Sequence, residues 1–274
     1  MTDAAADSHI LHHVDGGVLH ITINRPEVKN ALGSDDRLHI VELLDRASED
    51  LHVRAVVLTG AGGAFCSGAD LRASRSPLPR PEGAPDVAQG DVARGIRLYA
   101  QRLIAAIMDC EKPVIAAVDG VAAGMGAHMA FACDLVIASS RARFIEVFIR
   151  RALVPDAGGA YLLPRMIGPH RAKQLMFFGD DVSAADAHQL GLVNAVVAPQ
   201  ELLTTATQWA SRLASGPTRT IALTKALVNR SLDVDRATAF EAEANAQDMN
   251  MATHDGREGV TSFVERRAAD FRGW

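Results

Sequence analysis

The sequence is poor in aromatic residues, in cysteine and in positive charge, and each shortage excludes a class of protein. Phe, Trp and Tyr make up 5% of the 274 residues, too few for a stacking surface that binds nucleic acid. Lysine and arginine number 28 against 33 aspartates and glutamates, and the net charge of −5 also disfavours a nucleic-acid partner. Cys66, Cys110 and Cys133 form no CxxC pair, so we expect neither a disulfide framework nor a metal site.

The chain also lacks a long uninterrupted apolar run and a basic leader. Its most apolar stretch, residues 113–138, contains Asp119, His128 and Asp134, which are too many ionisable groups for a membrane span. The N-terminal MTDAAADSH carries acids where a secretory signal carries lysine or arginine. These features predict a cytoplasmic protein with no membrane partner. The 48% of hydrophobic residues suits one large domain, or one domain with an appendage.

Alternating apolar segments predict an α/β core. Two short β-runs flank Asp15-Gly16-Gly17, which supply the positive φ of a hairpin turn. From Ser34, a candidate cap, apolar residues recur at helical spacing, and residues 54–60 are typical of a strand buried on both faces. The alternation continues with a proline-rich surface loop at 72–92, a helix from about 91 to 110, and strands at 113–118 and 134–138.

After Ser183, another candidate cap, the pattern becomes almost wholly helical. We therefore expect two parts, a core over residues 1–198 that holds the functional site and a helical region over residues 199–274. The helices predicted in the second part are 199–214, 217–230, 236–252 and 256–268.

Two glycine-rich segments follow predicted strands. The first, Ala61–Leu71 (AGGAFCSGADL), lets a ligand approach the backbone but contains neither a GxGxxG dinucleotide loop nor a GxSxG nucleophile elbow. The second, residues 117–134, joins a strand to a helix through Gly120, Gly124 and Gly126, and free N–H groups at a helix start can bind an oxyanion. Either segment could instead serve only close packing of helix on strand.

A third segment, Leu153–Arg165 (LVPDAGGAYLLPR), places Asp156 after a proline and before two glycines. An aspartate in this setting can cap the following helix or act as an acid/base, and the two roles are compatible.

Six segments, in this order and spacing, resemble the crotonase superfamily, also called the enoyl-CoA hydratase/isomerase family. The resemblance implies a spiral of ββα units, a C-terminal helical region used in trimerisation, and a homotrimer or a hexamer built as a dimer of trimers. It also implies an acyl-CoA thioester as the ligand, with coenzyme A as part of the substrate and no separate cofactor. The six segments are INRPEVKNAL (23–32), AFCSGADL (64–71), KPVIAAVDGVAAGMG (112–126), VPDAGG (154–159), SAADAHQLGLVNAVV (183–197) and EGVTSFVERR (258–267).

The resemblance also assigns an oxyanion hole. The two backbone N–H groups that hold the thioester carbonyl fall on Ala69 and Met125, where methionine replaces the commoner glycine. An enolate-like oxygen gains charge in the transition state, so each preorganised donor contributes roughly 3 to 4 kcal/mol.

The acid/base residues depart from the hydratase pattern. Family hydratases use two glutamates, and the resemblance places His128 at the first position and Phe148, which cannot transfer a proton, at the second. Glu146 lies two residues from Phe148, so on a helix it would point about 200° away around the axis and could not substitute. His128 is either an auxiliary acid/base or a structural histidine.

Asp156 gains weight because some isomerases of this family resemble the sequence here, with Phe at the position of Phe148 and a catalytic aspartate in VPDxGG. One base suffices to move a proton between C2 and C4 of an enoyl thioester. We therefore favour a Δ3,Δ2-enoyl-CoA isomerase with Asp156 as catalytic acid/base. The alternatives are a hydratase that uses His128 and Asp156, and an acyl-CoA-binding protein without activity.

The remaining site residues concern the two ends of the substrate. Phe148 and Met129 line the acyl pocket or belong to the core, and Asp70 and Asp134 are expected to be structural. Coenzyme A phosphates need local cations in a net negative chain. The residues expected to contact coenzyme A are Lys29, Leu71, Arg72, Phe263 and Arg266.

Overall fold

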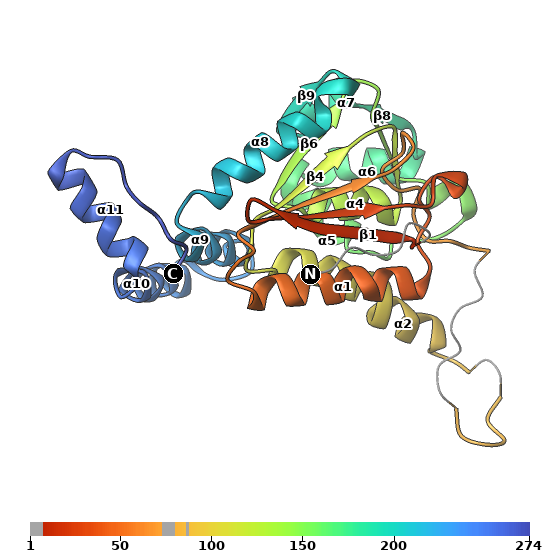
Figure 1. Cartoon of the computed structure of the whole chain (residues 1–274). Coiled ribbons are helices and arrows are strands. Elements are labelled where there is room, and N and C mark those ends of the chain that lie inside the picture. Colours follow the sequence, from red (N-terminus) through yellow and green to blue (C-terminus); the bar gives the residue numbers. More distant parts are fainter. Residues whose placement is uncertain (1–7, 73–79, 86–87) are drawn as a thin grey trace.

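The computed structural model describes residues 8–72, 80–85 and 88–274, which form an α/β fold around a six-stranded sheet (Figure 1). Strands β1 and β2 pair antiparallel, and the other neighbours in the order β1-β2-β3-β4-β6-β9 are parallel. The six strands are β1 (Ile10–Asp15), β2 (Val18–Ile23), β3 (Ala55–Gly60), β4 (Val114–Val118), β6 (Leu135–Ser139) and β9 (Ala195–Val197). The predicted α/β class and the strands of the core are confirmed.

Glycine makes the first hairpin possible. Gly16 and Gly17 both have positive φ, 53° and 79°, as the tight turn between β1 and β2 requires, and the predicted turn is confirmed. Strands β3 and β4 are buried on both faces, which explains their unbroken apolar sequences.

The two faces of the sheet belong to different hydrophobic clusters. One face packs on α1 (Ser34–Glu49), α3 (Arg102–Asp109) and α4 (Met125–Ala132). The other is covered by α8 (Leu202–Ala214), whose alanines let the helix lie close to the strands. A second, three-stranded sheet has the order β5-β7-β8. Its strands are β5 (Val121–Ala123), β7 (Arg143–Ile145) and β8 (Asp181–Ser183).

Helix ends agree with the sequence in one case and differ in another. Ser183 caps α7 (Ala184–Gln189) by accepting the Asp186 N–H at 3.1 Å, as predicted. The cap of α1 predicted at Ser34 is wrong, because Gly33 occupies the cap and the Asp36 carboxylate reaches back to its N–H at 2.8 Å.

The helix expected between 91 and 110 is present and contains a π-helical turn. Helix α2 (Asp91–Gly95) leads into π-helical Ile96–Gln101, which continues as α3. Of the loop expected at 72–92, residues 73–79 and 86–87 lie outside the described residues, and 80–85 are neither helix nor strand. The remaining helices of the core are α5 (Gly159–Ile167) and α6 (Pro169–Phe178).

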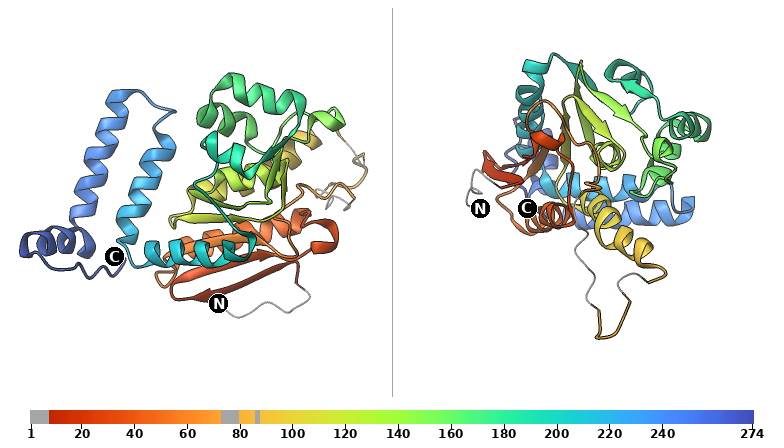
Figure 2. Two further views of the ribbon diagram at one scale, coloured as in Figure 1. Left: turned by 90° about the horizontal axis from the view of Figure 1, so that it is seen from above. Right: turned by 90° about the vertical axis from the view of Figure 1, so that its right-hand side faces the viewer.

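The last three helices form a lobe at one end of the core (Figures 1 and 2), and the first of them is bound to the core through Lys225. They are α9 (Thr218–Arg230), α10 (Arg236–Met251) and α11 (His254–Glu265), all close to their predicted bounds. The division at residue 198 stays a prediction, because strands end there but α8 still packs on the sheet. Large apolar side chains are exposed on the lobe, among them Phe240, Phe263 and Val264. Within the described ranges, no helix combines the length and the apolar character needed to cross a membrane.

Candidate active site

The first predicted oxyanion donor is the peptide N–H of Ala69. The carbonyl of Gly68, in the same peptide group, accepts a hydrogen bond from the Leu32 N–H at 2.9 Å, and the Asp70 N–H donates to the Leu32 carbonyl at 3.0 Å. Because C=O and N–H point in opposite directions in a trans peptide, the Ala69 N–H points away from Leu32. It is therefore not used in this bridge.

The second predicted donor is the N–H of Met125, at the start of α4. The Gly124 carbonyl accepts the first helical hydrogen bond, from the His128 N–H at 3.0 Å, so the Met125 N–H of the same peptide points out of the helix end. The Met125 side chain is buried in the core.

A glycine brings the two donors together. Gly68 has φ +105°, and a methyl group added there would lie 2.9 Å from the Ala123 carbonyl oxygen and 3.8 Å from the Met125 nitrogen. The peptide carrying the Ala69 N–H thus lies beside the helix end that carries the Met125 N–H. The two predicted residues are thus neighbours, and their role as oxyanion donors stays a prediction.

The loop that carries Ala69 is braced by the segment before α1. The Ser67 N–H donates to the Lys29 carbonyl at 2.9 Å, and the buried Asn30 amide donates to the carbonyls of Ala61 and Ala64 at 2.9 and 2.7 Å. Asn30 lies in the left-handed region, with φ 59°, which asparagine tolerates better than most residues. The segment that contains Lys29, predicted to contact coenzyme A, therefore also has a structural function.

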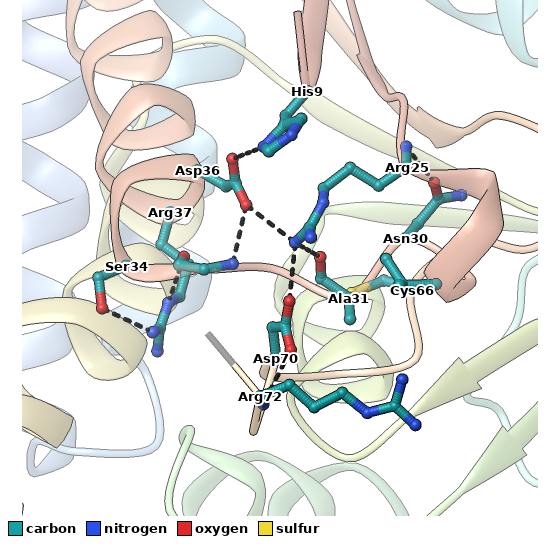
Figure 3. Close-up of polar contacts among 12 residues, drawn as sticks. His9, Arg25, Asn30, Ala31, Ser34, Asp36, Arg37, Cys66, Asp70 and Arg72 are labelled. Carbon is teal, nitrogen blue, oxygen red and sulfur yellow. Dashed lines mark hydrogen bonds and ion pairs between the residues drawn. The ribbon is translucent and has the colours of Figure 1, made fainter. Parts of the chain in front are cut away.

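A charged cluster holds the other side of this loop (Figure 3). The Arg25 guanidinium lies 3.1 Å from the Asp70 carboxylate and 3.5 Å from that of Asp36, and it donates to the Ala31 carbonyl at 2.7 Å. The structural role expected for Asp70 is confirmed. Sequence reasoning missed Arg25 and Asp36, because their contacts join residues up to 45 positions apart.

His128 is fully buried and hydrogen-bonded to a glutamate. Its Nε2 lies 3.0 Å from both carboxylate oxygens of Glu146, and its ring stacks on Phe148 with centroids 5.4 Å apart. The expectation that Glu146 and Phe148 diverge around a helix is wrong, because β7 ends at Ile145 and a turn follows. Both residues consequently face His128.

The neighbouring apolar candidate belongs to the core. Met129 has no exposed surface and packs among the buried residues of α4 and the sheet, which supports the core interpretation over an acyl-pocket lining. Phe148 is 8% exposed and lies against Gly124, since a methyl group there would come within 3.5 Å of its ring. Phe148 thus lies beside the residue that precedes Met125.

Asp156 lies in the loop that enters α5 and is half-buried. The cap of α5 is Gly158, with φ 79° and no side-chain hydrogen bond, so the interpretation of Asp156 as helix cap is wrong. The Gln101 side chain donates to the Asp156 carbonyl at 3.4 Å. The first helical residue, Gly159, lies against the His128 ring, so the Asp156 loop and the start of α4 meet at this histidine.

The predicted coenzyme A residues fall into two groups. Lys29, Leu71 and Arg72 are exposed around the Ala69 loop, where two cations are available to an anionic ligand. Phe263 and Arg266 are exposed at the far end of α11, on the lobe (Figure 1). One chain does not bring the two groups together.

Comparison with known proteins decides the family. The profile described as enoyl-CoA hydratase/isomerase matches residues 13–273. The chain belongs to this family. The α/β fold and acyl-CoA chemistry expected from the sequence are thereby established at the level of the family.

Relatives of this family carry both hydratase and isomerase names. The chain is 37% identical to 1,2-epoxyphenylacetyl-CoA isomerase of Escherichia coli, over 96% of this chain and 98% of that protein. It is 38% identical to crotonyl-CoA hydratase of Syntrophomonas wolfei, over 91% and 92%. Among solved structures, enoyl-CoA hydratase/isomerase from Cupriavidus metallidurans matches with TM-score 0.87, 35% identity and coverage of 99% and 98%. These names do not separate isomerase from hydratase for this enzyme.

Proposed function

We propose that this enzyme is an isomerase that moves a proton between C2 and C4 of an enoyl-CoA thioester, with Asp156 as the acid/base. One observation carries the proposal: Glu146, the carboxylate closest to the hydratase positions at His128 and Phe148, is buried and bound to His128. Asp156 is a half-buried residue of the loop that leads to Gly159, and Gly159 lies against His128.

The backbone donors stabilise the charge that develops in this reaction. The thioester oxygen would accept hydrogen bonds from the Ala69 and Met125 N–H groups while the Asp156 carboxylate removes a proton from C2 of a 3-enoyl thioester. The electron pair of the broken C–H bond enters a dienolate. Return of the proton to C4 moves the double bond to C2–C3 and regenerates the carboxylate. No second base is needed.

Hydration is the second candidate, because several relatives are named hydratases. It would require His128 and Asp156 to activate water together. The His128 ring has no exposed surface and its Nε2 is bound to Glu146, which disfavours this assignment. Incubation with a 2-enoyl and a 3-enoyl thioester separately discriminates the reactions by absorbance, since hydration removes conjugation and isomerisation creates it.

Substitution of Asp156 tests the proposal. We expect Asp156→Asn to lower the isomerisation rate at least 100-fold, or about 2.7 kcal/mol of transition-state stabilisation. Asp233→Asn is the matched control, because Asp233 binds Tyr161 and Arg165 on the exposed side of α5. The shuttle assignment is wrong if Asp156→Asn stays within about threefold of the wild-type rate. Thioester binding without turnover of any enoyl-CoA would instead support the non-catalytic alternative.

The separation of the coenzyme A residues supports an oligomeric site. We propose that Phe263 and Arg266 contact coenzyme A bound to another copy of the chain, in a homotrimer or hexamer. The exposed apolar side chains of the lobe supply a surface for such assembly. Sedimentation would give the assembly state, and Phe263→Ala should raise the KM for the thioester more than it lowers kcat.

A further inference from the structure

The buried pair of His128 and Glu146 lies between the two halves of the proposed active site. Glu146 is 4% exposed and follows β7, whereas His128 stands on α4 one turn after Met125. Carboxylate oxygens accept hydrogen bonds from N–H donors, so we take the imidazole Nε2–H to donate to Glu146. Among the residues that the structure describes, none forms a hydrogen bond with the His128 Nδ1. Glu146 therefore provides the hydrogen bonds that hold the ring side chain in place.

The imidazole ring contacts both α5, which follows the Asp156 loop, and Phe148, which lies beside the start of α4. A methyl group added at Gly159 would lie 2.1 Å from Nε2 and 2.3 Å from Cε1, so the start of α5 rests directly on the ring. The ring also stacks on Phe148, which in turn lies against Gly124, the residue whose peptide carries the Met125 N–H. A rotation of His128 would move α5, and with it the Asp156 loop, relative to the oxyanion donor.

We propose that Glu146 is a positioning residue that acts through His128 to fix the distance between the Met125 N–H and the Asp156 carboxylate. The inference rests on the proposed function for the role of Asp156. Glu146 touches neither the reacting carbon nor the thioester oxygen in this scheme. Loss of Glu146 shifts the Asp156 carboxylate relative to the Met125 N–H by up to about 1 Å. A shift of that size can cost on the order of 100-fold in rate.

Kinetics of the folded enzyme test the proposal. Glu146→Ala is expected to lower kcat for a 3-enoyl thioester at least tenfold with KM within threefold, because binding contacts stay and alignment is lost. Glu146→Gln keeps an oxygen that accepts from Nε2–H and should retain at least a third of kcat. The double variant Glu146→Ala/His128→Ala should be no more than twofold slower than His128→Ala alone, since both residues act as one unit.

Asp134→Ala is the matched control. Asp134 is a partly buried acid that follows the other end of α4 and pairs with Lys225 at 2.8 Å. Its loss should lower thermal stability and leave kcat per folded site within about twofold. The proposal is overturned by any one of three results. The first is an equal fall in kcat for this control, and the second is a kcat of Glu146→Ala within threefold of wild type. The third is a double variant whose loss in kcat equals the product of the two single losses.

A spectroscopic measurement keeps the inference separate from the isomerase assignment. The carbonyl stretch of a bound, unreactive butanoyl-CoA labelled with carbon-13 shifts when backbone donors bind the oxygen, whichever reaction follows. We expect Glu146→Ala to move this band back toward that of the free thioester, and a wild-type band would overturn the role of Glu146. Absence of 3-enoyl turnover by the wild-type enzyme would instead refute the proposed function. If Glu146→Ala does not fold, Glu146→Asp, shorter by one methylene, carries the test and should lower kcat at least fivefold.

Discussion

Substitution of Gly159 by alanine measures how tightly α5 packs on His128. The added methyl group would lie 2.1 Å from Nε2, where ordinary contacts begin at 3.4 Å, a shortfall of about 1.3 Å. The imidazole cannot yield easily, because it stacks on Phe148 and is bound to Glu146. Relief therefore requires displacement of α5 together with rupture of the bond to Glu146.

The expected cost follows from these two contributions. Overpacking of a well-packed core costs about 1 to 3 kcal/mol, and loss of a hydrogen bond to a charged group about 1.5 to 3 kcal/mol. We expect Gly159→Ala to lose about 3 to 5 kcal/mol of unfolding free energy, less the fraction of a kilocalorie that alanine gains in helix propensity. The thermal unfolding midpoint should fall by on the order of 10 °C.

Gly95→Ala is the control for this experiment. Gly95 ends α2 with φ −61°, and a methyl group there would meet no atom within 4 Å. Because alanine restricts the unfolded chain without strain in the native helix, Gly95→Ala should stabilise the protein by about 0.4 to 1 kcal/mol. The packing argument is refuted if Gly159→Ala is as stable as the wild type, or if both variants shift the midpoint in the same direction.

Two further predictions concern titratable groups. Burial raises the pKa of the Cys66 thiol to about 12, and Cys110 and Cys133 are buried as well. Thiol reagents at about pH 8 should therefore label the native protein negligibly and the unfolded protein at three sites. Rapid labelling of the native protein would contradict this prediction. The Arg267 guanidinium lowers the pKa of Glu258 from 4.5 to about 2. The ion pair of Glu258 therefore stabilises the fold fully above about pH 4.5, and this stabilisation is lost as the pH falls toward 2. The difference in unfolding midpoint between wild type and Glu258→Gln should accordingly shrink between about pH 6 and pH 3, and a constant difference would refute the assignment.

Local sequence patterns correctly predicted the strands in which nearly every residue is buried. Residues 54–60 and 113–118 form β3 and β4 as expected, because continuous apolar runs of this length suit strands buried on both faces. The Gly16-Gly17 turn followed from the φ angles that only glycine adopts readily. The family resemblance predicted that Ala69 and Met125 belong to one site, and the hydrogen bonds of Leu32 and His128 show why neither N–H is used within the backbone there.

The parts that were missed depend on side chains that reach across the fold. The turn after Ile145 carries no glycine or proline, so periodicity could not distinguish it from a helix, and the contact between Glu146 and His128 stayed hidden. The cap at Gly33 depends on the Asp36 carboxylate turning back to the backbone. Sequence patterns report which residues share one face of an element, whereas these contacts are set by how separate elements pack.

The donor at Met125 belongs to the main chain, which constrains how this site can vary. Replacement of its side chain alters packing but leaves the N–H in place, so many residues are compatible with the same chemistry at this position. Proline alone removes the donor. Met125 is the first residue of α4, a position where proline is tolerated. A residue that precedes proline avoids the helical conformation, and Gly124, with ψ −122°, is not helical. Met125→Pro should therefore fold yet lose on the order of 100- to 1,000-fold in kcat, far more than Met125→Ala.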